Sequence, residues 1–162
     1  MEEVIIAVGS NLGDRLSNLQ KAGNFLDSLS KETIEKSSIW ESEPVGAAKY
    51  TFYNAAAKIK TDLSPLSLLH ALKSFEQKCG REKNPDRWGP RILDLDIICY
   101  GNLVMDKESL IIPHPEYHER LFVLLPMQEI DKNRRDPVTN KRLDQMIGAA
   151  PLIDIKKTQM NW

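Results

Sequence analysis

The sequence predicts an α+β fold: a ferredoxin-like βαββαβ core with an antiparallel sheet and additional C-terminal helices. Two observations support this prediction. Strand-like and helix-like patterns follow one another along the chain in the order βαββαβ. Only a loop separates the two middle strands, which favours an antiparallel pair.

In the first half of the chain, the predicted elements are a strand at residues 4–8, a helix after the turn at 9–11, and strands at 33–40 and 52–59. The first strand is β-branched and ends at a Gly-Ser-Asn turn signal, which is typical of a central strand. Apolar residues then recur with approximately helical spacing up to Leu29, and Asp14 or Asn11 is placed to cap this helix.

In the second half, the predicted elements are a helix from Ser64 to Gly80, a strand at residues 93–100, and short helices at 119–127 and 142–147. Ser64 is a typical N-cap, Pro65 suits the first helical position, and Gly80 is a typical C-terminal cap. No repeat, low-complexity tract or linker interrupts the pattern. We therefore expect one domain over residues 1–162.

The composition excludes several classes of protein. Of the 162 residues 41% are hydrophobic, enough for a buried core, and a net charge of -1 gives no general field for nucleic acid or membrane. No apolar run reaches the ~20 residues of a membrane helix, and the acidic start is unlike a signal peptide. Cys79 and Cys99 are predicted to be reduced, buried thiols. We expect a cytoplasmic protein, with monomer as the default state.

The segment RWGPRILDLDI at residues 87–97 carries the clearest chemical signal. Side chains alternate along a strand, so Asp94 and Asp96 project from one face, about 6.5–7 Å apart, while their apolar neighbours point into the core. Two carboxylates on one face repel each other and lose hydration unless a cation compensates. The pair therefore predicts a Mg²⁺ site, because this ion is held by one or two carboxylates together with water and phosphates.

Basic residues surround this acidic pair in an otherwise neutral chain. They lie in or just before one loop: Lys78, Arg81, Lys83, Arg87 and Arg91. Arginines that face metal-bound phosphates are electrostatically favourable, so the cluster favours phosphate chemistry. A plainer interpretation stays open, in which Asp94 and Asp96 form salt bridges with Arg87 and Arg91 on a solvated face of the sheet.

Two other segments give weaker signals. Residues 9–14, GSNLGD, resemble a glycine-rich phosphate loop, but a structural turn is the simpler interpretation. His114 stands between two prolines, which suits a ligand contact, although a lone histidine is more often structural. The sequence contains no P-loop, Rossmann glycine motif or zinc-binding pattern, and its spacing suggests no Ser-His-Asp arrangement.

Four blocks of sequence together resemble the 6-hydroxymethyl-7,8-dihydropterin pyrophosphokinase family. They are GSNLGD at residues 9–14, FYNAA at 52–56, Gly80-Arg81 through RWGPRILDLDI, and Pro113-His114-Pro115 followed by Arg120-Leu121-Phe122. The blocks occur in the family's order, and RWGPRxLDLDI is highly specific. The resemblance implies a ferredoxin-like enzyme of folate biosynthesis. It would transfer the β,γ-pyrophosphoryl group of ATP to the pterin's hydroxymethyl oxygen and release AMP.

The resemblance also implies roles for individual residues. Asp94 and Asp96 would hold two Mg²⁺ ions, and with Arg81 and Arg91 they make up the catalytic set. The implied ATP-binding residues are Glu76, Arg81, Lys83, Arg87, Trp88, Arg91, Ile97, His114 and Arg120. The implied pterin-binding residues are Ser42, Pro44, Val45, Phe52, Asn54, Trp88 and Phe122, with Phe52 and Phe122 on either side of the ring. Glu43 departs from the family pattern, since it replaces an apolar residue in the pterin-side loop.

Two other functions stay open from the residues alone. A ferredoxin-like RNA-binding module would need exposed aromatic residues on the sheet and a basic surface, and neither is evident. The acidic pair alone does not exclude another Mg²⁺-dependent transferase, one that moves a nucleotidyl group or a single phosphoryl group. The product separates these reactions: AMP from pyrophosphoryl transfer, ADP from phosphoryl transfer, and free pyrophosphate from nucleotidyl transfer.

Overall fold

The computed structural model describes residues 1–44, 50–80 and 92–162. Its strands are β1 (Glu2–Ser10), β2 (Glu35–Lys36), β3 (Trp40–Ser42), β4 (Phe52–Thr61), β5 (Asp94–Tyr100), β6 (Met105–Lys107), β7 (Leu110–Ile112) and β8 (Ile155–Lys157). Its helices are α1 (Arg15–Leu29), α2 (Pro65–Lys78), the 3₁₀ turn η1 (Tyr117–Glu119), α3 (Leu121–Ile130) and α4 (Leu143–Ala149). Within these described ranges, no helix is long and apolar enough to span a membrane.

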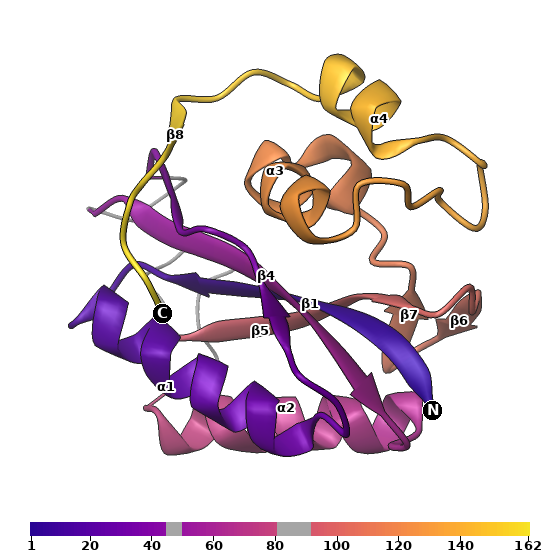
Figure 1. Ribbon diagram of the computed structural model, residues 1–162, viewed down its shortest axis with the longest axis horizontal. Coiled ribbons are helices and arrows are strands. Elements are labelled where there is room, and N and C mark those ends of the chain that lie inside the picture. Colours follow the sequence, from indigo (N-terminus) through magenta and orange to yellow (C-terminus); the bar gives the residue numbers. More distant parts are fainter. Residues whose placement is uncertain (45–49, 81–91) are drawn as a thin grey trace.

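The main sheet has the strand order β5-β1-β4-β3-β8, and the short β2 also pairs with β4 (Figure 1). β1 pairs antiparallel with β4 and β5, and β3 pairs antiparallel with β4. α1 connects β1 to the β2–β3 segment, and α2 connects β4 to β5. This is the ferredoxin-like arrangement, so the predicted fold class is confirmed.

The strand predicted at residues 33–40 is wrong as a single element, because it is divided into β2 and β3. Between them, the Ser37 hydroxyl accepts the N–H of Ala56 (2.8 Å). The Ser37 N–H donates to the Ala56 carbonyl (2.9 Å). A side-chain oxygen thus replaces a backbone carbonyl beside β4, which interrupts the regular ladder.

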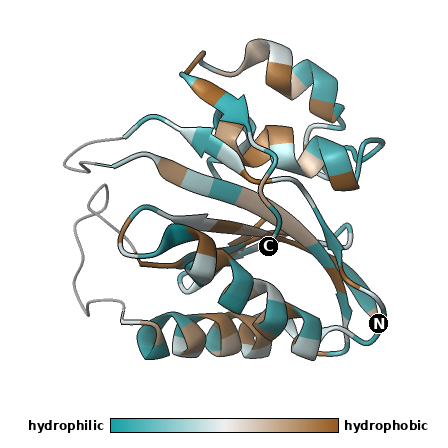
Figure 2. Cartoon of the chain, turned by 60° about the vertical axis from the view of Figure 1, so that its left-hand side comes forward, coloured by the Kyte–Doolittle hydropathy of each residue, from teal (hydrophilic) through white to brown (hydrophobic). Residues whose placement is uncertain are grey.

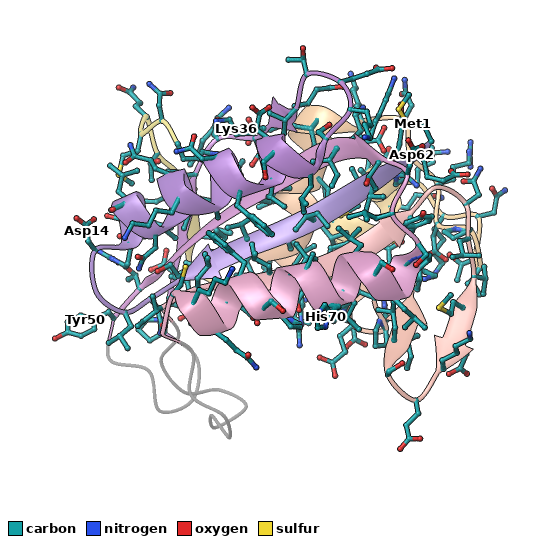
Figure 3. All side chains as sticks on the ribbon, turned by 90° about the horizontal axis from the view of Figure 1, so that it is seen from below. Met1, Asp14, Lys36, Tyr50, Asp62 and His70 are labelled. Carbon is teal, nitrogen blue, oxygen red and sulfur yellow. The ribbon has the colours of Figure 1, made fainter. Side chains whose placement is uncertain are left out.

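The two core helices begin and end close to where the sequence indicates. Asp14 caps α1 by accepting the N–H of Ser17 (3.1 Å), and Ser64 caps α2 in the same way (3.2 Å). Gly80 follows α2 with a φ of 100°, a left-handed conformation that favours glycine. The two helices lie side by side over one face of the sheet (Figures 1 and 3).

Alternation along the strands gives the sheet two different faces. The face covered by α1 and α2 is aliphatic, and its buried strand residues are Val4, Ile6, Val8, Ala55, Ala57, Ile59, Leu95 and Ile97. The opposite face packs against α3 and α4 around Ile5, Ala56 and Ile98. The helices predicted after the core are therefore confirmed, and the structure shows that they form a second covering layer. In Figure 2, α1 and α2 mix hydrophilic and hydrophobic residues, as expected of helices that bury one side against the sheet.

The β6–β7 hairpin and β8 are not among the predicted elements. β8 pairs with β3 at the far edge of the sheet, and the chain then runs toward α1 (Figure 1). There the Trp162 ring lies close to Gly23, and its Nε1 donates to the Ser37 carbonyl (2.8 Å). Strands of three residues are shorter than the commonest strand length and carry too little alternation to be recognised from sequence.

Candidate active site

Asp94 and Asp96 lie on β5, at the edge of the sheet. In the register with β1, Asp96 is opposite Ala7 and Asp94 is opposite Gly9. Leu95, between them, is buried in the aliphatic core, so the predicted alternation of faces is confirmed. Ala7 packs against the core under α3, which places both carboxylates on that face. Opposite the two carboxylates, β1 therefore presents only an alanine and a glycine.

Two charged residues of α2 close the outer edge of β5. Glu76 accepts the N–H of Leu95 (2.6 Å), and Lys73 Nζ donates to the Leu95 carbonyl (2.9 Å). Lys73 also pairs with Glu76 (3.0 Å) and with Asp96 (3.4 Å). Burial raises the pKa of the Glu76 carboxyl, and the charge of Lys73 opposes that change. The edge strand is therefore held by α2 at the point where it presents the acidic pair.

The electrostatics of Asp96 favour a bound cation. Its side chain is 32% exposed. Burial and the like charge of Asp94 raise its pKa, whereas Lys73 and His114 act to lower it. Negative charge at this position is therefore under-compensated by the described residues, which is the condition that a divalent cation relieves.

His114 and Arg120 approach the same face from the segment before α3. The N–H of His114 donates to the carbonyl of Ile98 on β5 (2.9 Å). Its Nδ1 accepts the N–H of Glu116 (3.2 Å), so the neutral ring carries its proton on Nε2 and can donate from there. Burial lowers the pKa of His114, as does the charge of Arg120. Arg120 pairs with Glu116, and its guanidinium lies 5.7 Å from the ring centroid of Phe122.

The predicted pterin residues of β3 and β4 share this face as well. Ser42 is opposite Phe52, and Asn54 is opposite Trp40. Asn54 Nδ2 donates to Ser42 Oγ (2.8 Å) and to the Trp40 carbonyl (3.1 Å). The amide is thus fixed with its Oδ1 toward Gly9, where a Cβ atom would lie 3.8 Å from that oxygen and 4.0 Å from Phe52.

Asp94, Gly9 and Asn54 occupy one row across three neighbouring strands, β5, β1 and β4. Strands lie ~4.8 Å apart, so the backbones of Asp94 and Asn54 are about 10 Å apart, with a residue without a side chain between them. Phe122, in the first turn of α3, is half-buried and packs against the core of the same face. The structure therefore brings the acidic pair and the predicted pterin residues to one end of one face.

The turn after β1 is held by structural hydrogen bonds. Ser10 Oγ donates to the Ile92 carbonyl (2.5 Å), and Asn18 Nδ2 donates to the same carbonyl (3.1 Å) and to that of Leu12 (3.0 Å). These bonds fix the chain just before it enters β5. They favour the structural interpretation of the GSNLGD segment.

Several predicted site residues lie outside the described residues: Val45, Arg81, Lys83, Arg87, Trp88 and Arg91. Pro44 is exposed. Ile97 is buried on the aliphatic face, so its side chain is not brought beside Asp96, and Glu76 connects to Asp96 through Lys73. Within the described ranges, no three His, Cys, Asp or Glu residues are grouped to hold a metal ion.

Sequence reasoning missed Lys73 and Arg15. Lys73 stands three residues before Glu76, a spacing that places two helical side chains together, but this spacing alone does not indicate contact with β5. Arg15 contacts the β3–β4 hairpin from the start of α1. Both contacts join segments distant in sequence, so a local pattern does not reveal them.

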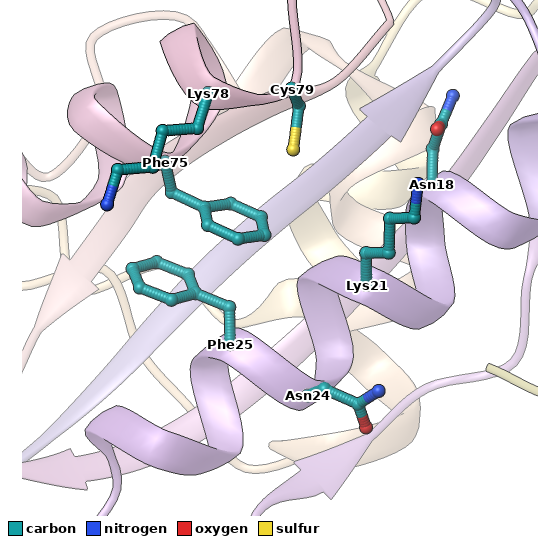
Figure 4. A pocket seen from close by; sticks show the side chains of 7 residues that line it. All are labelled: Asn18, Lys21, Asn24, Phe25, Phe75, Lys78 and Cys79. Atoms are coloured by element: carbon teal, nitrogen blue, oxygen red, sulfur yellow. The ribbon is translucent and has the colours of Figure 1, made fainter.

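A separate hollow lies between α1 and α2 (Figure 4), with a volume of about 620 Å³. It is lined by Asn18, Lys21, Asn24, Phe25, Phe75, Lys78 and Cys79. The rings of Phe25 and Phe75 stack with their centroids 4.1 Å apart. The hollow contains none of the predicted site residues.

Relatives at the sequence level cover nearly the whole chain. The chain is 42% identical to the 2-amino-4-hydroxy-6-hydroxymethyldihydropteridine pyrophosphokinase of Bacillus subtilis, over 86% of this chain and 84% of that protein. It is 34% identical to the enzyme of the same name from Pseudomonas aeruginosa, over 97% of both chains. It is 42% identical to a folate synthesis bifunctional protein of Arabidopsis thaliana, but spans only 27% of that longer chain.

Solved structures support the fold. The wild-type HPPK-DHPS of Plasmodium falciparum with pterin and p-hydroxybenzoate matches 91% of this chain, with a TM-score of 0.70 and 16% identity. This chain spans 41% of that structure. Residues 5–132 match the family described as 7,8-dihydro-6-hydroxymethylpterin-pyrophosphokinase (HPPK). The chain therefore belongs to the 7,8-dihydro-6-hydroxymethylpterin-pyrophosphokinase family and is an enzyme, a pyrophosphokinase.

Proposed function

We propose that the chain transfers the β,γ-pyrophosphoryl group of ATP to 6-hydroxymethyl-7,8-dihydropterin, giving the dihydropterin pyrophosphate and AMP. Family membership makes the chain a pyrophosphokinase for hydroxymethyldihydropterin in folate synthesis, with ATP as co-substrate. The observation that carries the fuller proposal is the row Asp94, Gly9 and Asn54, because it joins an acidic pair to pterin-side groups on one face.

The residues present fit two Mg²⁺ ions held by Asp94 and Asp96. Both carboxylates face one side, and a glycine and an alanine lie opposite them on β1. The raised pKa of Asp96, caused by burial and by Asp94, is the condition that a cation would relieve. Two carboxylates completed by water and phosphate oxygens suit magnesium, which, when bound, neutralises charge and orients a triphosphate.

Pyrophosphoryl transfer requires positioning and charge neutralisation more than a strong base. The hydroxymethyl oxygen attacks the β-phosphorus of ATP. The bond between that phosphorus and the α,β-bridging oxygen breaks, and AMP leaves with the electron pair. The hydroxyl proton passes to solvent. We assign to His114 Nε2 and Arg120 the donation of hydrogen bonds to phosphate oxygens, which is supported by the engagement of His114 Nδ1 with the Glu116 N–H. We assign Arg81 and Arg91, which lie outside the described residues, to the same task.

The pterin is proposed to lie between Phe52 and Phe122, since a flat heteroaromatic ring is well held by aromatic faces. Asn54 and the backbone from Ser42 to Val45 would hydrogen-bond the ring's polar edge. Asn54 is already held rigidly by Ser42, which lowers the entropy cost of that contact. The further proposed ligand residues are Pro44 and Trp88 for the pterin, and Glu76, Lys83, Arg87, Trp88 and Ile97 for ATP.

We further propose that residues 1–162 form a single domain that acts as a monomer in the cytoplasm. Cys79 and Cys99 are both free thiols, which supports a reducing compartment. Cys99 is buried as predicted, whereas Cys79 is only half-buried. Gel filtration with light scattering tests the monomer, which a dimer mass would contradict.

A product assay tests the proposed reaction. Purified chain is incubated with ATP, Mg²⁺ and reduced 6-hydroxymethyl-7,8-dihydropterin, and nucleotide products are separated by chromatography. We expect AMP and pyrophosphorylated pterin in equal amounts, and neither without pterin or with excess chelator. Pterin-dependent ADP would contradict the proposal and indicate single phosphoryl transfer. Free pyrophosphate without AMP would indicate nucleotidyl transfer.

A further inference from the structure

The β3–β4 hairpin presents different residues on its two faces. Ser42 is opposite Phe52, and Asn54 is opposite Trp40, so these side chains share the face on which the pterin is proposed to bind. The Trp40 indole donates to a glutamate of α3 (2.6 Å), which confirms that this face is the one under α3. The residues between them in sequence must therefore point to the opposite face.

That opposite face carries Glu41, Tyr53 and Thr51, and Arg15 of α1 contacts all three. The Arg15 Nη1 donates to the Thr51 carbonyl (2.8 Å) and to the Thr51 hydroxyl (2.7 Å). That hydroxyl donates in turn to the Glu41 carboxylate (2.9 Å), which lies 3.9 Å from Arg15 itself. The guanidinium carbon lies 3.9 Å from the centroid of the Tyr53 ring.

These contacts join the end of β3 to the beginning of β4 through one side chain. Glu41 directly precedes Ser42, and Thr51 directly precedes Phe52. Arg15 and Glu41 are only 25% and 23% exposed, so the ion pair and hydrogen bonds are partly shielded from water. Charge-assisted hydrogen bonds in such surroundings are stronger than exposed ones.

Arg15 is itself held by a rigid element. It is the first residue of α1, which Asp14 caps and which buries Leu19, Ala22 and Leu26 against the sheet. The helix start and Tyr50, the residue before Thr51, lie at the same end of the molecule (Figure 3). The guanidinium therefore holds the hairpin in a fixed position relative to α1.

We propose that Arg15 is a positioning residue that fixes Ser42 and Phe52 for pterin binding from the back of the hairpin. The inference rests on the proposed function, because it assigns these residues to the pterin. The acidic pair lies on β5, which is separated from β3 by two strands, so ATP binding does not depend on this contact. Loss of Arg15 therefore acts on one substrate.

The test measures the dissociation constants of the reduced pterin and of an ATP analogue for the wild-type chain and for Arg15→Ala. We expect pterin binding to weaken about 10-fold, the size of one or two charge-assisted hydrogen bonds, with ATP binding unchanged. Arg15→Lys keeps the charge without the fork and should give an intermediate loss. Arg142→Ala, which removes a surface arginine that pairs with Asp144, is the matched control and should change neither constant.

The outcomes separate the two proposals. Equal losses for both ligands, or no loss for either, would overturn the positioning role while the proposed function stands. A wild-type chain that binds no pterin would overturn both proposals together. If Arg15→Ala does not fold, Glu41→Gln is measured instead, because it keeps the size of the side chain while removing its charge. Glu41→Gln should weaken pterin binding by a smaller factor than the one expected for Arg15→Ala, with ATP binding unchanged. An unchanged pterin dissociation constant would overturn the positioning role.

Discussion

The two faces of the central sheet differ in what they do. The face under α1 and α2 is aliphatic except where Arg15 contacts the β3–β4 hairpin, and Ile6, Ile59 and Leu95 on it are fully buried. The face under α3 is aliphatic only around Ile5 and Ile98. Beyond that point it carries the acidic pair of β5 and the amide of β4, among other side chains.

This difference shows how one strand serves stability and function together. On β5, Leu95 contributes to the core while Asp96, the next residue, is two-thirds shielded from water beside another carboxylate. Burial of the apolar side favours folding, whereas repulsion between the two neighbouring carboxylates on the other side opposes it. The comparison predicts that substitutions on the aliphatic face change stability, and that substitutions on the polar face change activity.

The largest effect is expected for Asp96→Asn. The amide removes a metal ligand charge, so kcat should fall about 1000-fold or more, equivalent to roughly 4 kcal/mol of transition-state stabilisation. The melting temperature should stay the same or rise, because repulsion with Asp94 is removed. Steady-state kinetics and calorimetry measure the two quantities. Asp144→Asn, an exposed aspartate of α4, is the control, and wild-type kcat in Asp96→Asn would refute the metal assignment.

Ile6→Ala tests the aliphatic face. Ile6 lies on β1, and its side chain is fully buried under the helices α1 and α2. Its truncation should therefore lower the free energy of unfolding by about 2–5 kcal/mol. Activity per folded molecule should remain near that of the wild type at a temperature where both are folded. Urea denaturation gives the first value and active-site titration the second. A large loss of kcat with unchanged stability would contradict the division between the faces.

The sequence predicts much of the difference between the two faces, because that difference follows from local patterns of residues. Strand alternation places Asp94 and Asp96 opposite Leu95, and capping residues mark both ends of α2. The contacts of Lys73 with β5 and of Arg15 with the hairpin were not predictable, since they depend on how distant elements pack. The prediction of a single strand at residues 33–40 was wrong for a similar reason, because its interruption depends on a contact with a distant strand.

In that strand, the interruption depends on one hydrogen bond between the Ser37 hydroxyl and Ala56. Serine is common in regular strands and in bulges, so its identity does not show which of the two will form. Strand β8 was missed because its pairing with β3 comes from tertiary packing, with Ile155 placed opposite Ser42. The blocks that resemble the family predict site residues that physical patterns alone do not single out, among them Phe52 and Phe122.

Phe122→Ala should give a smaller effect than Asp96→Asn and should act on one substrate. Removing one aromatic face should weaken pterin binding about 10- to 30-fold, equivalent to roughly 1.5–2 kcal/mol, with ATP binding little changed. Fluorescence titration of the pterin and calorimetric titration of an ATP analogue measure the two constants. Phe25→Ala, which removes a stacked ring on the opposite side of the sheet, is the control and should change stability only. Equal losses for both ligands would count against the proposed sandwich.

The smallest effect concerns the polar anchor of the α3 layer, Asp136. Its carboxylate accepts hydrogen bonds from the Tyr117 hydroxyl (2.5 Å), from the N–H groups of Val138 (3.1 Å) and Thr139 (2.8 Å), and from the Thr139 hydroxyl (3.0 Å). Burial alone would raise the pKa of Asp136, but these bonds hold it below its usual value. A lowered carboxyl pKa contributes stability above the unfolded-state pKa, and this contribution is lost as the pH falls through the folded-state pKa.

Asp136→Asn should therefore lower the free energy of unfolding at pH 7 by about 1–2 kcal/mol, because a neutral amide accepts these bonds more weakly. The gap between wild type and variant should narrow as the pH falls below about 4, where the unfolded-state aspartate becomes protonated. Urea denaturation at pH 7 and at acidic pH measures both. If the difference in free energy of unfolding between wild type and variant does not change with pH, Asp136 contributes through packing and not through its charge. The α3 layer would then be stabilised by packing, as the aliphatic face is.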